Sequence, residues 1–359
     1  MNSDEGIRCM VMRGGTSKGL YFLKDELPAD TAERDSFLLR LMGSPDARQI
    51  DGLGGAHSLT SKVAIVSAGQ LEGELEYLFL QLGVDKATVS DRQNCGNLLA
   101  GVAPFAIERG LIKVDGDEAH VGIFMLNTDS RATATFPLRD GLPVYTGKTA
   151  ISGVPGTAAE IRLDFDDIEG SSCGALLPTG NVVDVINGVE CTLVDNGMPT
   201  VVMRATDVGA TGYETVDELE ANTELRERVE AIRLLAGPMM NLGDVTSTTV
   251  PKMTLVAPPA DGGDISTRSF IPHTPHDAIG VLAAVSVATA AALPGGPGAS
   301  VLSGPKTPGT IIIEHPTGTF EATVDITISE NGDVMVGKAG IIRTARKLMD
   351  GISYPRETL

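Results

Sequence analysis

The sequence predicts an α+β protein made of two similar domains, each with strands arranged around a buried central helix. Short apolar runs bounded by Gly, Pro, Asn or Asp recur along the chain and are typical of β-strands. Two helical segments, 96–109 and 278–293, are apolar on nearly every face, so each must be surrounded by protein. A length of 359 residues also favours two domains over one.

The strands are expected to be short and to dominate both halves of the chain. They are predicted at 63–67, 75–81, 122–126, 161–165, 192–195, 201–205, 253–256, 310–314 and 322–328. Two further helices are expected besides the buried ones. Residues 31–42 have apolar side chains at helical spacing and end before Gly43, and residues 216–236 form an amphipathic segment rich in Glu, Leu and Arg.

The same order of motifs occurs twice along the chain. The heptapeptide SKVAIVS at 61–67 matches PKMTLVA at 251–257, with a lysine leading into a strand in each copy. A glycine-bearing polar turn, 13–16 or 195–198, precedes each copy. A second polar turn, 94–97 or 273–277, follows it and leads into the buried helix. We infer an internal duplication.

The duplication predicts how the domains are divided. The N-terminal domain is expected at 1–184 and the pseudo-repeat domain at 185–343, with the crossing near 180–185. The segment 344–359 is expected to pack back onto the first domain. In a duplicated two-domain protein the cleft between the halves is the natural ligand site.

Composition and charge exclude several functions. The net charge of −19 disfavours nucleic acid and anionic membrane surfaces as partners. No apolar run reaches the roughly 18–20 residues of a membrane span, and the acidic residues 1–6 do not resemble a signal peptide, so a cytoplasmic protein is expected. The four cysteines form no CxxC pair and the five histidines are scattered. No metal is expected, and without a dinucleotide or P-loop motif no nucleotide cofactor is expected either.

Cys95 is the first candidate for chemistry, because it lies at the predicted start of the first buried helix. A helix N-terminus stabilises a thiolate, and a thiol in that position can both give and take a proton. A buried structural cysteine is an equally good interpretation of the spacing alone. Cys173, in a turn of small residues, is expected to be structural or to line the cleft, and Cys9 and Cys191 are expected in the core.

Lys62 is the second candidate, because it leads directly into an apolar strand. Loss of solvation beside such a strand favours a neutral amine, which can act as a base. An exposed lysine at a strand edge is the simpler alternative.

The segment 12–19 (MRGGTSKG) could bind a carboxylate. It combines two cations, two hydroxyls and three glycines, so backbone N–H groups, hydroxyls and an arginine can surround an anion. An ordinary glycine-rich turn is the alternative. In an acidic protein, local cations such as Arg13, Lys18, Lys62 and Arg268 are what an anionic substrate requires.

Several long strings make the chain resemble a known family. MRGGTSKG, GSPDARQIDGLGGAHSLTSKVAIV, QNCGN, SSCGALLPTGN, DNGMP, MNLGD, RSFIPH and RTARKLMDG occur in the order found in the PrpF-like isomerases of the diaminopimelate-epimerase-like fold. The resemblance runs from about residue 9 to 351. Within the family, the chain most resembles the 4-oxalomesaconate isomerases and tautomerases of bacterial aromatic-acid catabolism (protocatechuate and gallate 4,5-cleavage, lignin-derived). It implies two pseudo-symmetric domains, each a curved β-sheet or barrel around a central helix, with the active site between them and no cofactor.

The resemblance also implies roles for individual residues. Lys62 matches the catalytic lysine of the TSK motif and Cys95 the catalytic cysteine of the NCGN motif. Substrate-binding positions are implied in both halves, those of the second half being matched by position only. They are Arg13, Thr16, Ser17, Lys18, Ser61, Asn94, Gly96, Asn97, Arg268, Ser269 and His273. His57 departs from the pattern, because close relatives are expected to carry Asp there.

The expected function is a cofactor-independent proton transfer that migrates a double bond or interconverts keto and enol forms of 4-oxalomesaconate. An aconitate or 2-methylaconitate isomerase with the same site is the alternative within the enzyme class, and a non-catalytic polycarboxylate-binding protein is the alternative outside it. The expected partner is a small anionic polycarboxylate. The sequence is compatible with a homodimer or another homo-oligomer.

Overall fold

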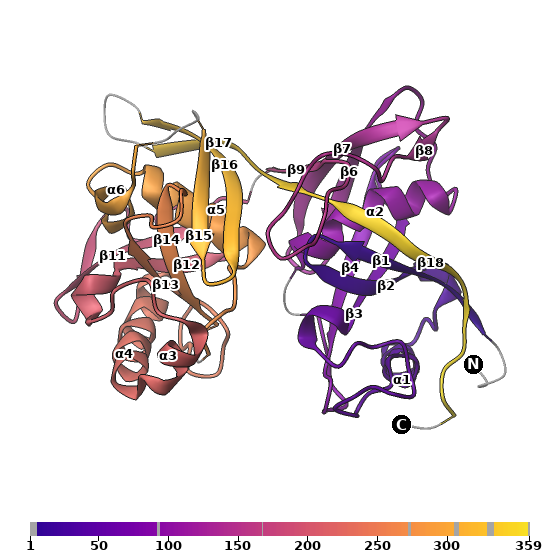
Figure 1. The fold of residues 1–359 in the computed structure, drawn as a ribbon, viewed down its shortest axis with the longest axis horizontal. Coiled ribbons are helices and arrows are strands. Elements are labelled where there is room, and N and C mark those ends of the chain that lie inside the picture. Colours follow the sequence, from indigo (N-terminus) through magenta and orange to yellow (C-terminus); the bar gives the residue numbers. More distant parts are fainter. Residues whose placement is uncertain are drawn as a thin grey trace. The chain divides into compact units, whose positions relative to one another are not determined.

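The computed structural model describes residues 6–91, 94–166, 168–271, 274–304, 309–328 and 334–357. The chain divides into two compact units (Figure 1). Unit 1 comprises residues 1–163 and 342–359, and unit 2 comprises residues 164–341. The boundary falls before the predicted crossing near 180–185, because the segment after residue 168 is bonded within unit 2. There the buried Asp195 carboxylate accepts hydrogen bonds from the backbone N–H groups of Ser172 and Cys173.

Unit 1 contains a mixed sheet in which antiparallel and parallel strand pairs alternate. Strands β1 (Ile7–Gly14) and β2 (Ser17–Leu23) are antiparallel, β2 and β3 (Lys62–Ala68) are parallel, and β3 and β4 (Leu75–Leu82) are antiparallel. Strand β4 then pairs in parallel with β6 (Glu118–Met125), and β6 pairs antiparallel with β7 (Ser130–Arg139). The short β5 (Val89–Ser90) pairs antiparallel with β4, and the short β8 (Leu142–Pro143) pairs antiparallel with β7.

The last strand of the chain lies beside the first. Strand β18 (Ala345–Ser353) pairs antiparallel with β1, and Figure 1 shows the yellow C-terminal strand running along the indigo N-terminal one. The C-terminal segment therefore belongs to unit 1.

Two helices cover opposite faces of the β3–β4 pair. Helix α1 (Thr31–Met42) has the predicted bounds, with the Asp30 side chain accepting from the Glu33 N–H at its start and Gly43 in the left-handed region at its end. Its apolar side chains share a core with Val63 and Ile65. Because side chains alternate along a strand, Lys62 and its alternate neighbours face the other side, where helix α2 (Gly96–Glu108) packs. Short 3₁₀ segments lie at Lys24–Glu26 and Ser58–Thr60.

Unit 2 repeats the order and the sense of these pairings. Strands β11 (Val189–Asp195) and β12 (Pro199–Arg204) are antiparallel, β12 and β13 (Lys252–Ala257) parallel, and β13 and β14 (Ile265–Phe270) antiparallel. Strand β14 pairs in parallel with β15 (Thr310–His315), which is antiparallel to β16 (Gly318–Ile328). Strand β10 (Asp184–Ile186) pairs with β11, and β17 (Val334–Arg343) pairs with β16. The predicted α+β fold with two pseudo-symmetric halves is confirmed.

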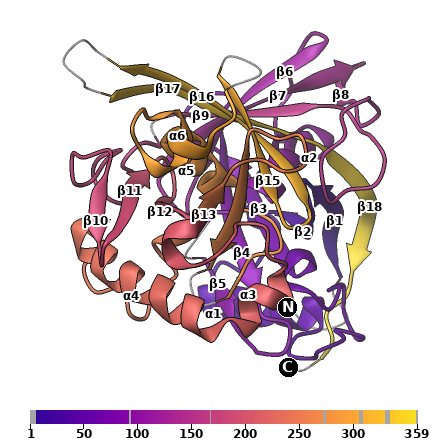
Figure 2. The same cartoon turned by 60° about the vertical axis from the view of Figure 1, so that its left-hand side comes forward.

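The helices of unit 2 differ from the prediction in two details. The predicted helix 216–236 is two helices, α3 (Val216–Ala221) and α4 (Thr223–Met239), because Asn222 between them has non-helical dihedrals and its side chain accepts from the Leu225 N–H. The predicted helix 278–293 is α5 (Val281–Ala292), which begins later because Gly280, with φ −66° and ψ 143°, is its extended N-cap. Figure 2 shows α5 among the strands of unit 2 and α3 and α4 at its periphery.

Both apolar helices are buried as predicted. In α2 every residue from Leu98 to Ile107 is buried, and in α5 every residue from Val281 to Ala291 is buried. A 3₁₀ segment, Ala205–Val208, and the short helix α6 (Pro297–Val301) complete unit 2. No helix among the described residues is long and apolar enough to cross a membrane.

Candidate active site

Lys62 is the first residue of β3, between two partner strands of unit 1. It lies opposite Gly19 of β2 and Gln81 of β4. Its side chain is buried, with 7% of the residue exposed, and its Nζ donates a 2.7 Å hydrogen bond to Gln81 Oε1. The same Nζ lies 5.1 Å from the centre of the Phe79 ring. The alternative interpretation, an exposed lysine at a strand edge, is therefore wrong.

The loop before Lys62 is held by a buried polar network. Ser61 Oγ contacts both Gln49 Oε1 and the His57 carbonyl oxygen at 2.9 Å, and Gln49 Nε2 donates to Ser44 Oγ. Ser61 and Gln49 are both buried. The structure thus places Ser61, an implied substrate-binding residue, in contacts that fix the entrance to β3.

His57 acts as a helix cap in the described structure. Its Nδ1 accepts a 3.1 Å hydrogen bond from the Leu59 N–H at the start of the Ser58–Thr60 turn, and the residue is exposed. An Asp carboxylate makes the same contact at many helix starts. The departure from the family pattern at this position is therefore compatible with the local fold.

Cys95 is the N-cap residue of α2 and is buried, with 9% exposed. Its carbonyl oxygen accepts from the Leu99 N–H at 3.0 Å and from the Tyr77 hydroxyl at 3.3 Å. The Tyr21 hydroxyl donates to the Leu98 carbonyl oxygen at 2.6 Å. Burial raises the pKa of both tyrosines well above 10, and the neighbouring negative charge of a Cys95 thiolate raises them further. Both hydroxyls therefore stay protonated.

One face of β4 contacts both candidate catalytic residues. Tyr77, Phe79 and Gln81 are alternate residues of this strand and project from the same face. Tyr77 bonds the backbone of Cys95, whereas Phe79 and Gln81 contact the Lys62 amine. The Lys62 amine and the backbone of Cys95 thus contact the same face of one strand.

The MRGGTSKG turn lies against the first turn of α2. A Cβ atom on Gly15, which has φ +51°, would overlap Asn97 Oδ1, and one on Gly14 would overlap the Asn97 carbonyl oxygen. Asn97 Nδ2 donates to Thr16 Oγ1 at 3.2 Å, and the Thr16 N–H donates to Asn97 Oδ1 at 3.4 Å. The structure therefore brings the turn and the NCGN motif together, and only glycine permits this close approach.

Two polar atoms in these motifs have no hydrogen-bond partner among the described residues. They are the Oγ of Ser17, which is 1% exposed, and the Oδ1 of Asn94. Buried polar atoms are normally paired, so an unpaired hydroxyl beside a candidate site is suited to a ligand oxygen. Lys18 Nζ lies next to Gly55, at 3.4 Å from the position a Cβ would take there.

Arg13 and Arg268 are bonded to protein oxygens. Arg13 Nη1 donates to the carbonyl oxygens of Gly15 and Thr344 and to Thr344 Oγ1, which ties the turn to the segment before β18. Arg268, in unit 2, donates to the carbonyl oxygens of Glu214 and Thr267, and its burial lowers its pKa. These contacts anchor backbone segments.

The other implied positions of unit 2 are placed as follows. Ser269 Oγ lies 3.0 Å from Thr254 Oγ1, with both residues buried. His273 lies outside the described residues. His276, which was expected only as part of the polar turn 273–277, accepts through Nδ1 from the Ala278 N–H just before α5.

Sequence reasoning missed three residues that the structure places in notable positions. Lys252 begins β13 as Lys62 begins β3, is 9% exposed, and donates from Nζ to the Thr249 carbonyl oxygen at 2.7 Å. Burial, followed by the charge of Arg233, lowers its pKa to about 8. The match of PKMTLVA to SKVAIVS is the signal that could have singled it out. Tyr77 and Gln81 have no such signal.

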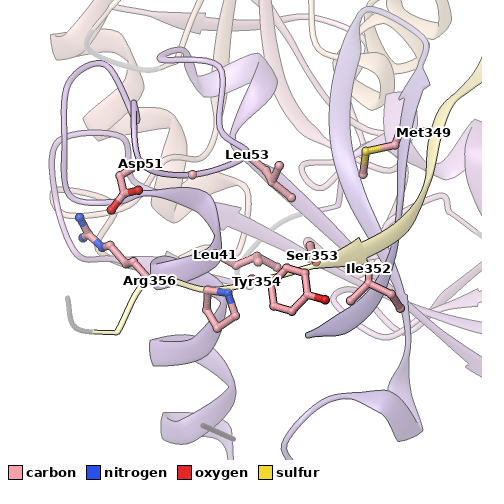
Figure 3. Close-up of a pocket in the computed structure, with 10 residues that line it drawn as sticks. Leu41, Asp51, Leu53, Met349, Ile352, Ser353, Tyr354 and Arg356 are labelled. Atoms are coloured by element: carbon pink, nitrogen blue, oxygen red, sulfur yellow. The ribbon is translucent and has the colours of Figure 1, made fainter. Parts of the chain in front are cut away.

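A cavity of about 430 Å³ in unit 1 lies elsewhere. Figure 3 shows Leu41 of α1, Leu53, and Ile352 and Tyr354 of the C-terminal segment around it. None of the predicted site residues lines it. Among the described residues no three His, Cys, Asp or Glu side chains gather in a way that could hold a metal ion.

The fold is shared with proline racemases and epimerases, and the relatives of this chain define its class as an isomerase. A crystal structure of a hydroxyproline epimerase from Agrobacterium vitis shares this fold, with a TM-score of 0.57 and 11% identity over 99% of this chain and 94% of that one. A crystal structure of a methylitaconate-delta-isomerase is more similar, with a TM-score of 0.85 and 34% identity over 98% and 96% of the two chains.

The chain belongs to the PrpF protein family, whose pattern it matches over residues 5–356. It is 60% identical to the (4E)-oxalomesaconate Delta-isomerase of Novosphingobium sp. (strain KA1) over 96% of both chains. It is 54% identical to the 4-oxalomesaconate tautomerase of Pseudomonas putida, over 96% of this chain and 95% of the relative.

Proposed function

We propose that this protein isomerises 4-oxalomesaconate without a cofactor, by moving a proton and with it a double bond. The observation that carries the proposal is that one face of β4 contacts two buried residues, Lys62 through its amine and Cys95 through its backbone. Such a pair offers one group to take a proton and one to give it. The identities of 60% and 54% to proteins named for this substrate support the choice of oxalomesaconate.

The surroundings of the pair suit an anionic ligand. The start of α2 has no side-chain cap from Cys95, and among the described residues its first backbone N–H groups and the partial positive charge there favour a carboxylate or an enolate oxygen. The unpaired Ser17 hydroxyl and the Thr16–Asn97 pair lie in the two motifs that meet at this helix start. Lys18 supplies positive charge in a protein of net charge −19.

The chemistry needs a base, an acid and stabilisation of the negative charge that develops between the two steps. In 4-oxalomesaconate the methylene beside the keto group is also allylic, so loss of its proton gives a dienolate spread over keto and carboxylate groups. In the proposed mechanism neutral Lys62 takes this proton and becomes an ammonium. The Cys95 thiol then protonates the far carbon, which completes the migration of the double bond, and the resulting thiolate regains a proton as Lys62 loses one.

A tautomerase would use the same groups and protonate oxygen instead of carbon. An aconitate or 2-methylaconitate isomerase is a second candidate with the same machinery. It has weaker support, because the methylitaconate isomerase structure is 34% identical to this chain, well below the two oxalomesaconate relatives.

Proton NMR of the product formed from 4-oxalomesaconate in deuterated water tests the proposal. Deuterium at the far carbon is expected for allylic migration, whereas exchange at the methylene alone indicates tautomerisation. If oxalomesaconate stays unchanged and 2-methylaconitate is converted, the second candidate replaces the first.

We further propose the cytoplasm as the compartment. All four cysteines are unpaired and buried, as expected for thiols kept reduced.

A further inference from the structure

We propose that Gln81 is a positioning residue that aims the Lys62 amine at the substrate and leaves it free to act as a base. The inference rests on the proposed role of Lys62. It starts from the 2.7 Å hydrogen bond that Lys62 Nζ donates to Gln81 Oε1.

The orientation of the Gln81 amide is fixed by its other end. Gln81 Nε2 faces the carbonyl oxygens of Ser58 and Ser61 at 3.1 Å and of Leu82 at 3.2 Å. A flipped amide would set its oxygen against these three carbonyl oxygens and its NH₂ group against the Lys62 amine. The network therefore leaves Oε1 as the atom that faces Lys62.

The contacts of Lys62 limit where its nitrogen can go. Gln81 Oε1 holds one hydrogen of Nζ, and the Phe79 ring lies 5.1 Å away. Gln81 is directly opposite Lys62 in the β3–β4 ladder, so the contact does not depend on a loop. A long, flexible side chain is thus held in one direction, which is what a base needs if it is to reach one particular proton.

The neutrality of the acceptor matters as much as its position. Among the described residues Lys62 has no carboxylate in ion-pair contact. A carboxylate beside an amine favours the charged ammonium, which cannot accept a proton, whereas an amide oxygen orients the amine without adding a charge. Glutamine is therefore suited to hold a lysine that must lose its proton.

The second half of the molecule serves as an internal comparison. Lys252 occupies the equivalent strand position, but the register of β13 and β14 begins with the pair Met253–Phe270, so no residue of β14 is paired with Lys252. Its Nζ donates instead to the Thr249 carbonyl oxygen, at 2.7 Å. The amide acceptor therefore belongs to the site of unit 1 and is not a requirement of the repeated fold.

Two variants with side chains of nearly the same size as glutamine test the position of the Lys62 amine and its charge separately. Gln81→Met removes the acceptor, so kcat should fall about 10- to 100-fold at every pH, with KM changed less than about 2-fold. Gln81→Glu keeps an acceptor but adds a charge. Its kcat at pH 7 should fall by a similar factor and should recover as the pH rises, with the alkaline shift of the pH–rate profile amounting to about 1 unit or more. Gln70→Glu, on an exposed residue, adds the same charge and should behave as wild type.

Outcomes for the two proposals can be told apart. If Lys62→Met is inactive while folded Gln81→Glu and Gln81→Met keep the wild-type kcat and pH profile, the Gln81 inference is wrong and the proposed base stands. If Lys62→Met is active, the proposed function of Lys62 fails first. If the Gln81 variants do not fold, the side-chain amide protons of Gln81 in the wild-type protein decide by NMR. Slow exchange with solvent supports the network, and fast exchange of both protons overturns it.

Discussion

The hydroxyl of Tyr77 lies 3.3 Å from the carbonyl oxygen of Cys95 and donates a hydrogen bond to it. Tyr77 is four residues before Gln81 on the same face of β4, so the strand that orients Lys62 also contacts the start of α2. Groups that must act together are best supported by one rigid element. Strand β4 meets this requirement, although none of its residues was predicted to belong to the site.

Replacing Tyr77 by Phe removes the hydroxyl and leaves its ring in place. The free energy of unfolding should fall by about 0.5–1.5 kcal/mol, the usual worth of one hydrogen bond, as measured by urea denaturation. Tyr354→Phe is the matched control, because Tyr354 is 65% exposed. Equal stability of the two variants would show that the contact with Cys95 contributes nothing.

Lys62→Met and Cys95→Ser should each lower turnover of oxalomesaconate at least about 100-fold, because each removes one partner of the proton transfer. An ultraviolet assay of substrate conversion measures this, and circular dichroism shows whether each variant folds. Lys113→Met, on an exposed lysine, and Cys191→Ser, in the core of unit 2, serve as controls and should keep turnover per folded molecule. A folded Lys62 or Cys95 variant with near-normal turnover removes that residue from the mechanism.

His57→Asp should keep turnover within about 2-fold and should leave stability equal or raise it by a few tenths of a kcal/mol, because Asp is a better helix cap than His. His57→Ala should instead lower the free energy of unfolding by about 0.5–1 kcal/mol through loss of the contact with Leu59. Chemical denaturation and the conversion assay check both. Loss of turnover in a stable His57→Asp protein would indicate that His57 contacts the substrate.

Gly101→Ala should destabilise the protein by about 1–3 kcal/mol, although alanine is normally favoured in helices. The added Cβ would lie 2.5 Å from the Tyr21 hydroxyl oxygen and 2.8 Å from Tyr21 Cζ, and Tyr21 is fully buried. Gly351→Ala is the control, because a Cβ there meets no described atom within 4 Å. Thermal unfolding of both variants should show a clear loss for Gly101→Ala alone.

Lys252 should make stability rise with pH. Its folded-state pKa of about 8 lies below the ordinary value of 10.5, so the unfolded chain binds more protons between these values. The free energy of unfolding of the wild type relative to Lys252→Met should therefore increase from about pH 8 to 10.5, by about 1–3 kcal/mol. The buried thiols contribute equally to the pH dependence of both proteins, so their contribution cancels in this difference. Urea unfolding at several pH values measures the difference. A decrease over this window would mean that the Lys252 ammonium is stabilised in the fold.

The sequence by itself determined the fold class, the duplication and the bounds of α1. The duplication rests on motifs that recur in the same order, and the elements rest on local signals. Helix α1 is fixed by Asp30 and Gly43 at its own ends, and α2 and α5 by apolar residues on all their faces. The break between α3 and α4 also has a local cause, the Asn222 cap. The amphipathic pattern continues across Asn222, however, so the sequence predicted one helix and only the structure showed two.

Only the tertiary structure decided what the polar side chains contact. Arg13 and Arg268 were assigned from their charge, yet they bond the backbone of Thr344 and Glu214, residues far away in the sequence. Gln81 meets Lys62 because β3 and β4 pair in one particular register, and a shift of one residue would put the two side chains on opposite faces of the sheet. Such contacts depend on how distant segments pair, and the chain carries no local pattern that encodes them.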